Sequence, residues 1–219
     1  MQRSMLPELG KPLPEMNQPP FTDPHYSEHG VTALVLAGGN SSRMGTDKAL
    51  LHWQGIPLLE RVCQAAAQSC SRVYVLTPWP QRYQLLLPEG CHILLESISG
   101  QGPLVALEQG LRQISTTWLL LLACDLPLLN PTILQRWITL LPDEEVMAVV
   151  PHHLGRWEPL CGFYHAQSHP DLRSFLKQGG RSFQAWLSTL TTQKIALDAT
   201  ATAMLWNCNS PEDLTPPEV

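Results

Sequence analysis

Short apolar runs alternate with longer segments of helical periodicity along most of the chain. The apolar runs are rich in Val, Ile and Leu and are too short for helices, which indicates buried strands. We expect such strands at 32–37, 72–76, 92–95, 118–123 and 146–150. Apolar positions with helical spacing predict helices at 57–69, near 79–87, at 103–114 and at 131–141.

The alternation of strand and helix predicts the fold class. Consecutive parallel strands joined by helices form right-handed crossovers, which place helices on both faces of one sheet. We therefore expect a Rossmann-like α/β fold with a mostly parallel sheet. The order Asn130-Pro131 indicates a helix start, and Gly179-Gly180 ends one helix before Arg181-Ser182 opens the next segment.

The organisation of the chain follows from length and proline content. The 219 residues, 44% of them hydrophobic, suffice for one well-buried core and are too few for two typical domains. Residues 1–30 are rich in proline and poor in paired apolar positions, so we expect a disordered tail there. We place one domain at 31–214 and a short tail at 215–219.

Charge and cysteine content limit the partners and the compartment. A formal net charge of −5 gives no general attraction for nucleic acid or for an anionic membrane. The apolar run 118–124 is far shorter than the ~20 residues that cross a bilayer, and the amino terminus lacks a signal-peptide pattern. The six cysteines show no disulfide framework and are expected to be reduced core thiols. These features predict a cytoplasmic protein with a small-molecule partner.

The segment ALVLAGGNSSRMGTDKAL at 33–50 is the first candidate for a binding site. A strand ends there in Gly38-Gly39, and Arg43 and Lys48 follow. In open α/β sheets ligands bind beyond the carboxyl ends of the strands, and glycines allow the backbone to approach phosphate closely. The spacing matches neither a Walker A loop nor GxGxxG. Phosphate binding therefore competes with a tight turn followed by two solvated cations.

The segment WLLLLACDLPLLNP is the second candidate. It places Asp125 directly after a strongly apolar strand, where an isolated carboxylate would be costly unless it met water, donors or a cation. An aspartate in this place commonly ligates a Mg²⁺ ion that also holds substrate phosphates. The alternative is that Asp125 is a turn or capping residue.

Together these motifs resemble the molybdenum cofactor guanylyltransferases, within the superfamily of nucleotidyltransferases with a GT-A-like fold. The resemblance runs from about residue 31 to 214 and rests on four segments in the family's order: LAGGNSSRMGTDKALLHWQGIPLLERV at 36–62, GPLVAL at 102–107, CDLPLL at 124–129 and WNCNSPEDL at 206–214.

The resemblance implies roles for individual residues of the nucleotide site. Arg43 and Lys48 correspond to the cations of the triphosphate site, and with Asp125 they form the expected catalytic group. The loop under the nucleotide corresponds to Leu36, Ala37, Gly38 and Gly39, and the loop near the base to Gly102, Pro103 and Leu104.

The metal and the acceptor are also implied by the resemblance. Asp125 corresponds to the magnesium ligand, with Mn²⁺ as a substitute ion, and Asn207 or Asn209 stands near that metal. Glu158-Pro159-Leu160 would lie toward the acceptor. The chain departs from the family by carrying Glu96 where an aspartate is usual, so the acidic contact to the base is left open.

The resemblance implies transfer of GMP from GTP to the terminal phosphate of molybdopterin, with release of pyrophosphate. Molybdenum-insertion proteins and recipient molybdoenzymes would be further partners. Two alternatives stay open at this point: a related nucleotidyltransferase that uses CTP or another phosphorylated acceptor, and a non-catalytic module that binds a nucleotide or the cofactor.

Overall fold

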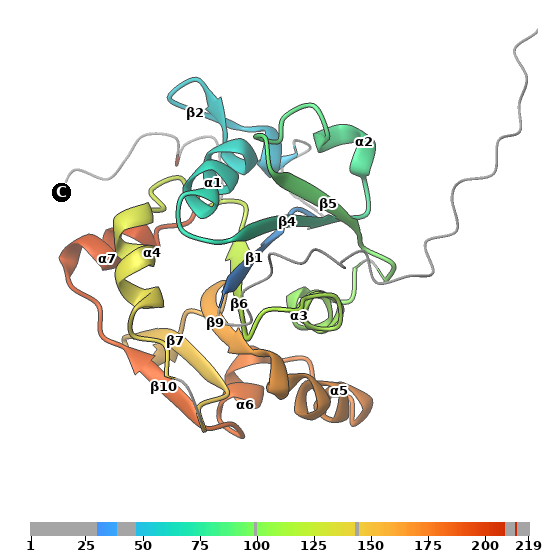
Figure 1. Cartoon of the computed structure of the whole chain (residues 1–219), viewed down its shortest axis with the longest axis vertical. Helices are drawn as coiled ribbons and strands as arrows, with labels where there is room; N and C mark the ends of the chain where they lie inside the picture. Colours follow the sequence, from blue (N-terminus) through green and yellow to red (C-terminus); the bar gives the residue numbers. More distant parts are fainter. Residues whose placement is uncertain (1–29, 39–46, 99, 143–144, 209–212, 214–219) are drawn as a thin grey trace, which may run out of the picture.

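The structure is a computed structural model that describes residues 30–38, 47–98, 100–142, 145–208 and 213. Its centre is a twisted sheet in the spatial order β10-β7-β9-β6-β1-β4-β5, with β8 paired to β7 (Figure 1). The strands of this sheet are β1 (Val31–Leu36), β4 (Arg72–Thr77), β5 (Cys91–Leu95), β6 (Trp118–Ala123), β7 (Ala148–His153), β8 (Arg156–Trp157), β9 (Cys161–His165) and β10 (Thr192–Ile195).

Most neighbours in the sheet are parallel. Strand β1 pairs in parallel with β4 and β6, β4 pairs with β5, and β7 pairs with β10. Two strands depart from this pattern: β9 runs antiparallel to both β6 and β7, and the short β8 runs antiparallel to β7. The carboxyl ends of β1, β4 and β6 therefore meet at one edge of the sheet, and that of β7 points the same way.

Helices cover both faces of the sheet (Figure 1). The helices are α1 (Leu58–Ala67), α2 (Pro80–Tyr83), α3 (Pro103–Leu111), α4 (Pro131–Ile138), α5 (His169–Lys177), α6 (Phe183–Leu187) and α7 (Ala199–Met204). Two short 3-10 helices, η1 (Lys48–Leu50) and η2 (Ala166–Ser168), and a small hairpin of β2 (His52–Trp53) and β3 (Ile56–Pro57) complete the described elements. None of the helices in the described part of the chain combines the length and apolar character that crossing a bilayer requires.

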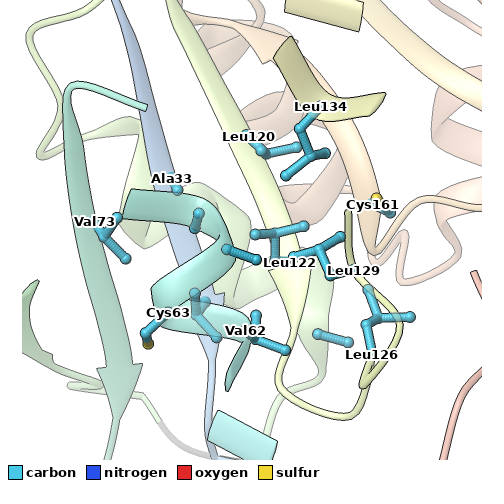
Figure 2. Close-up of a cluster of buried hydrophobic side chains, with 14 of the residues drawn as sticks. Ala33, Val62, Cys63, Val73, Leu120, Leu122, Leu126, Leu129, Leu134 and Cys161 are labelled. Carbon is cyan, nitrogen blue, oxygen red and sulfur yellow. The ribbon is translucent and has the colours of Figure 1, made fainter. Parts of the chain in front are cut away.

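The alternation of side chains along β1 divides the core into two layers. Ala33 and Val35 face the layer formed with α1, α4 and α7, whereas Leu34 faces the layer formed with α3, α5 and α6. Figure 2 shows part of the first layer, in which Val62 of α1 and Leu122 of β6 lie among Leu126 and Leu129 of the following loop. Apolar packing thus continues beneath the loop that leaves β6.

The α/β class and the first half of the element order are confirmed. Asn130 caps α4 by accepting hydrogen bonds from the backbone of Thr132 at 2.9 Å and of Ile133 at 3.3 Å, as its pairing with Pro131 predicts. The prediction of a helix near 79–87 was too long: α2 spans only Pro80–Tyr83 and is followed by turns. Strands β8, β9 and β10 were not predicted. All six cysteines are free thiols, as expected.

Candidate functional site

A cavity of about 430 Å³ opens at the carboxyl ends of β1, β4 and β6. Its walls come from the ends of these strands, from η1 and α2, and from the loop before α3. The lining residues are Leu36, Ala37, Gly38, Asp47, Lys48, Ala49, Leu76, Tyr83, Glu96, Gly100, Gly102, Pro103, Ala106, Ala123, Cys124, Asp125 and Leu160. Two charged candidates from separate motifs, Lys48 and Asp125, thus share one cavity.

The end of β1 forms a wall made mainly of backbone. The Ala37 amide donates to the Leu76 carbonyl at 3.0 Å, which extends the pairing with β4 past the end of the strand. A Cβ atom on Gly38 would overlap the Glu96 carboxylate and would lie 3.1 Å from Pro78 Cδ. A side chain on Gly38 would therefore have to displace the Glu96 carboxylate and crowd Pro78, whereas glycine brings bare backbone against that carboxylate.

Glu96 follows β5 and reaches the same wall. Its amide donates to the Thr77 carbonyl at 2.9 Å, which fixes the start of its loop against β4. Partial burial raises the pKa of Glu96 above its usual value. The carboxylate thus lies in the cavity wall beside Gly38, and Gly102 and Pro103 line the same cavity.

Lys48 and Asp125 form an ion pair across the cavity. Lys48 Nζ lies 3.8 Å from Asp125 Oδ2, and the side chains are 26% and 17% exposed. Burial raises the pKa of Asp125, and the positive charge of Lys48 opposes that rise. A distance of 3.8 Å is too long for a strong hydrogen bond, so the contact between the ammonium and the carboxylate is mainly electrostatic.

The second carboxylate oxygen of Asp125 is the best candidate for a metal ligand. Asp125 Oδ1 is buried and has no hydrogen-bond partner among the described residues. Such an orphaned oxygen is costly unless a cation or water completes it. The described residues hold no group of three His, Cys, Asp or Glu side chains that could bind a metal by themselves. A hard cation on Asp125 would therefore draw most other ligands from substrate phosphates and water.

The carboxyl-terminal segment lies against the same loop. The Cys208 amide donates to the Asp125 carbonyl at 2.9 Å, and the Trp206 ring packs on Trp53 with 5.4 Å between ring centroids. Asn207 is exposed and is not among the lining residues, although it is adjacent to that hydrogen bond. The segment is thereby anchored beside Asp125.

The lining of the cavity includes most of the expected nucleotide-site residues within the described part of the chain. These are Leu36, Ala37, Gly38, Lys48, Glu96, Gly102, Pro103 and Asp125. Leu104 is not among the lining residues, and its side chain is 1% exposed and packs in the α3 layer of the core. Gly39, Arg43 and Asn209 lie outside the described residues. Leu160, expected toward the acceptor, also lines the cavity.

Two residues that sequence reasoning missed support Lys48. Tyr83 of α2 lines the cavity, and its hydroxyl donates to Asp47 Oδ2 at 2.6 Å. The sequence indicates Asp47 only as part of the segment 33–50 and assigns it no role of its own. In the structure it caps η1, the element that carries Lys48. No periodicity joins positions 36 residues apart, so only the fold shows the Tyr83 contact.

Comparisons with known proteins identify the family of the chain. The model of the MobA-like NTP transferase domain matches residues 33–193. A Nostoc protein named a probable molybdenum cofactor guanylyltransferase is 50% identical over 188 residues, which are 85% of this chain and 89% of that protein. A Synechococcus elongatus protein of the same name is 46% identical over 186 residues, covering 83% of this chain and 94% of that protein.

Solved structures show the same fold. The molybdopterin-guanine dinucleotide biosynthesis protein A from Archaeoglobus fulgidus superimposes with a TM-score of 0.67 at 21% identity, covering 84% of this chain and 94% of that chain. A nucleotidyl transferase from Methanothermobacter gives a TM-score of 0.65 at 17% identity, with the same coverage of both chains, 84% and 94%. With the domain match and the curated relatives, the fold leads to one conclusion: the chain belongs to the family of MobA-like NTP transferase domains.

Proposed function

We propose that this chain transfers GMP from GTP to the terminal phosphate of molybdopterin and releases pyrophosphate. The names of the curated relatives supply the reaction. The observation in this chain that carries the proposal is the pairing of Lys48 with Asp125, whose second oxygen is buried and has no hydrogen-bond partner within the described ranges. An ammonium and a cation-ready carboxylate at the carboxyl edge of the sheet suit a triphosphate.

The chemistry needs no nucleophile from the protein. An oxygen of the acceptor phosphate forms the new bond to the α-phosphorus of GTP, and the bond from that phosphorus to the β-phosphate bridge breaks. The neighbouring thiol does not compete for this role, because burial raises the pKa of Cys124 and keeps it neutral. Catalysis then rests on alignment and on neutralising the phosphates.

The residues divide this work between two sides of the cavity. Lys48 neutralises phosphate oxygens, and Asp125 would hold Mg²⁺, or Mn²⁺ in its place, with Oδ1 free to ligate it. When bound, the ion supplies Lewis-acid stabilisation of the charge that develops on the phosphates. Glu96, which lines the cavity beside the bare backbone of Gly38, would accept from the N–H donors of the guanine base. Leu160 lies on the acceptor side.

The test is a pyrophosphate-release assay on the unaltered full chain with molybdopterin and Mg²⁺. We expect release with GTP that depends on both the acceptor and the divalent ion, and little release with ATP or CTP. Equal or better use of CTP would instead assign a cytidylyl transfer. Nucleotide binding without pyrophosphate release, under any acceptor, would make the chain a binding module. Location in the cytoplasm and contacts with molybdenum-insertion proteins or recipient molybdoenzymes remain predictions.

A further inference from the structure

Asp47 lines the cavity, and its carboxylate is held from three directions by the protein itself. Its Oδ2 accepts a hydrogen bond from the Tyr83 hydroxyl at 2.6 Å and lies 3.6 Å from Arg82 Nη1. Its Oδ1 accepts from the Ala49 amide at 3.2 Å, which makes Asp47 the cap of η1. Both oxygens therefore have partners within the protein: Oδ1 contacts a backbone amide, and Oδ2 contacts two side chains.

The element that Asp47 caps is short and carries Lys48 as its first residue. Helix η1 has only three residues, of which Ala49 is buried and Leu50 packs partly against the core, while Lys48 lines the cavity. A single 3-10 turn gains little from its own hydrogen bonds. The direction in which the Lys48 ammonium points thus depends strongly on the cap that precedes it.

Tyr83 is built to donate to that cap. It comes from α2, and its side chain is 1% exposed. Burial, together with the hydrogen bond to Asp47, raises the pKa of the Tyr83 phenol well above its usual value. The hydroxyl therefore stays protonated, and its short bond to a carboxylate is of the strong, charge-assisted kind.

We propose that Tyr83 is a positioning residue for nucleotidyl transfer, which fixes Asp47 and through it the Lys48 ammonium that faces Asp125. The proposal deepens the proposed function and rests on it. Tyr83 itself takes no proton and forms no bond to the substrate. Arg82 strengthens the same cap from the exposed side, since its own side chain is 53% exposed.

The first variant is Tyr83→Phe, which removes only the hydroxyl and keeps the buried ring. We expect kcat for GTP-dependent pyrophosphate release to fall about 10-fold, because misplacing a catalytic group by a fraction of an ångström lowers rate steeply. The matched control is Thr116→Val, which removes a buried hydroxyl that bonds Thr32 at 2.9 Å at the opposite, amino-terminal edge of β1 and β6. Control kcat should be unchanged.

A double-mutant cycle then separates positioning from a merely structural role. If Tyr83 acts through Lys48, the Tyr83→Phe change should have almost no effect on kcat in a Lys48→Ala background. An equal loss in both backgrounds would overturn the proposal and assign Tyr83 a direct contact or a general packing role. Unchanged kcat in the single variant would also overturn it. Because the unaltered chain is assayed first, lack of any transfer by that chain would count against the proposed function and not against the cap.

Discussion

The two segments that supply the charged pair, η1 with Lys48 and the loop after β6 with Asp125, are held in place by different forces. Asp125 stands at the start of a loop supported by the core, where Leu126 is 2% exposed and Leu129 is 9% exposed (Figure 2). Arg61 Nε also donates to the Pro127 carbonyl of that loop at 2.6 Å. Lys48, by contrast, follows a cap whose contacts are polar, from Tyr83 and Arg82.

This difference separates the expected consequences of mutation. Removing an apolar side chain beneath the Asp125 loop also lowers the free energy of unfolding, because the same side chains form the core. Polar support can be removed one bond at a time while the fold persists, at a net cost of about 1 kcal/mol for an ordinary hydrogen bond. Changes around Lys48 should therefore alter turnover, whereas changes beneath Asp125 should alter stability.

The largest effect is expected for Asp125→Ala. Pyrophosphate release by this variant should fall by about 10³-fold or more, because the divalent ion and Lys48 both lose the carboxylate that they contact. Thermal unfolding should show a melting temperature no lower than that of the unaltered chain, because a buried oxygen without a partner is removed. Asp171→Ala, on exposed α5, is the control and should keep full turnover. Normal turnover of Asp125→Ala would remove this residue from the site.

Lys48→Ala should lower turnover by less. An ammonium that acts on transition-state charge contributes roughly 2–4 kcal/mol, which corresponds to about 30- to 1000-fold in kcat. The melting temperature should scarcely change, because the side chain is partly exposed. Lys177→Ala on the exposed face of α5 provides the matched control. A variant that unfolds easily yet turns over normally in the cold would show that Lys48 is structural.

Leu126→Ala tests the apolar side of the comparison. Deleting this buried side chain should lower the free energy of unfolding by about 2–5 kcal/mol, measured by urea denaturation, because a cavity opens in the core. Leu140→Ala is the control, since that leucine is 59% exposed and should change stability little. A loss of activity in Leu126→Ala without a loss of stability would break the distinction between the two segments.

Glu96→Gln should weaken the choice of base. A carboxylate that accepts from two guanine N–H groups becomes an amide that accepts with one oxygen, and an unpaired donor costs roughly 1–3 kcal/mol. We expect the ratio of kcat/KM for GTP over ATP to fall by about 10-fold. Glu89→Gln, which is exposed, should leave the ratio unchanged. An unaltered ratio in Glu96→Gln would assign base selection to the backbone of the segment after β1 and of the loop before α3.

The smallest effect is a pH dependence of stability at Asp125. Burial raises its pKa in the folded protein, so the folded state binds this proton more tightly than the unfolded chain does. The stability linked to this proton is therefore present below the unfolded pKa of about 4 and is lost as pH rises through the folded pKa. Asp125→Asn should gain stability over the unaltered chain near neutral pH, and that gain should vanish in acid. Urea denaturation at several pH values, without divalent ions, measures it.

How far sequence reasoning reached depended on the kind of contact. The strong strand of β6 and the strand-then-glycine pattern of β1 were recognisable locally, and their parallel pairing brings Asp125 and the Gly38 loop to one edge. The short strands β9 and β10 lack a distinctive apolar run, so neither they nor the antiparallel insertion of β9 was predicted. The burial of the Leu104 side chain in the α3 layer could not be read from its motif position, which says nothing of which helix face it occupies.

The sequence by itself determined that a glycine-containing segment and an acidic residue follow two apolar strands, because local periodicity and the rules of parallel sheets suffice for that. Only the tertiary structure decided what holds these groups. The bond from Tyr83 to Asp47 and that from Cys208 to the Asp125 carbonyl join distant parts of the chain. Such contacts arise when whole layers pack, and a hydrogen bond between single polar groups leaves no periodic trace in the sequence.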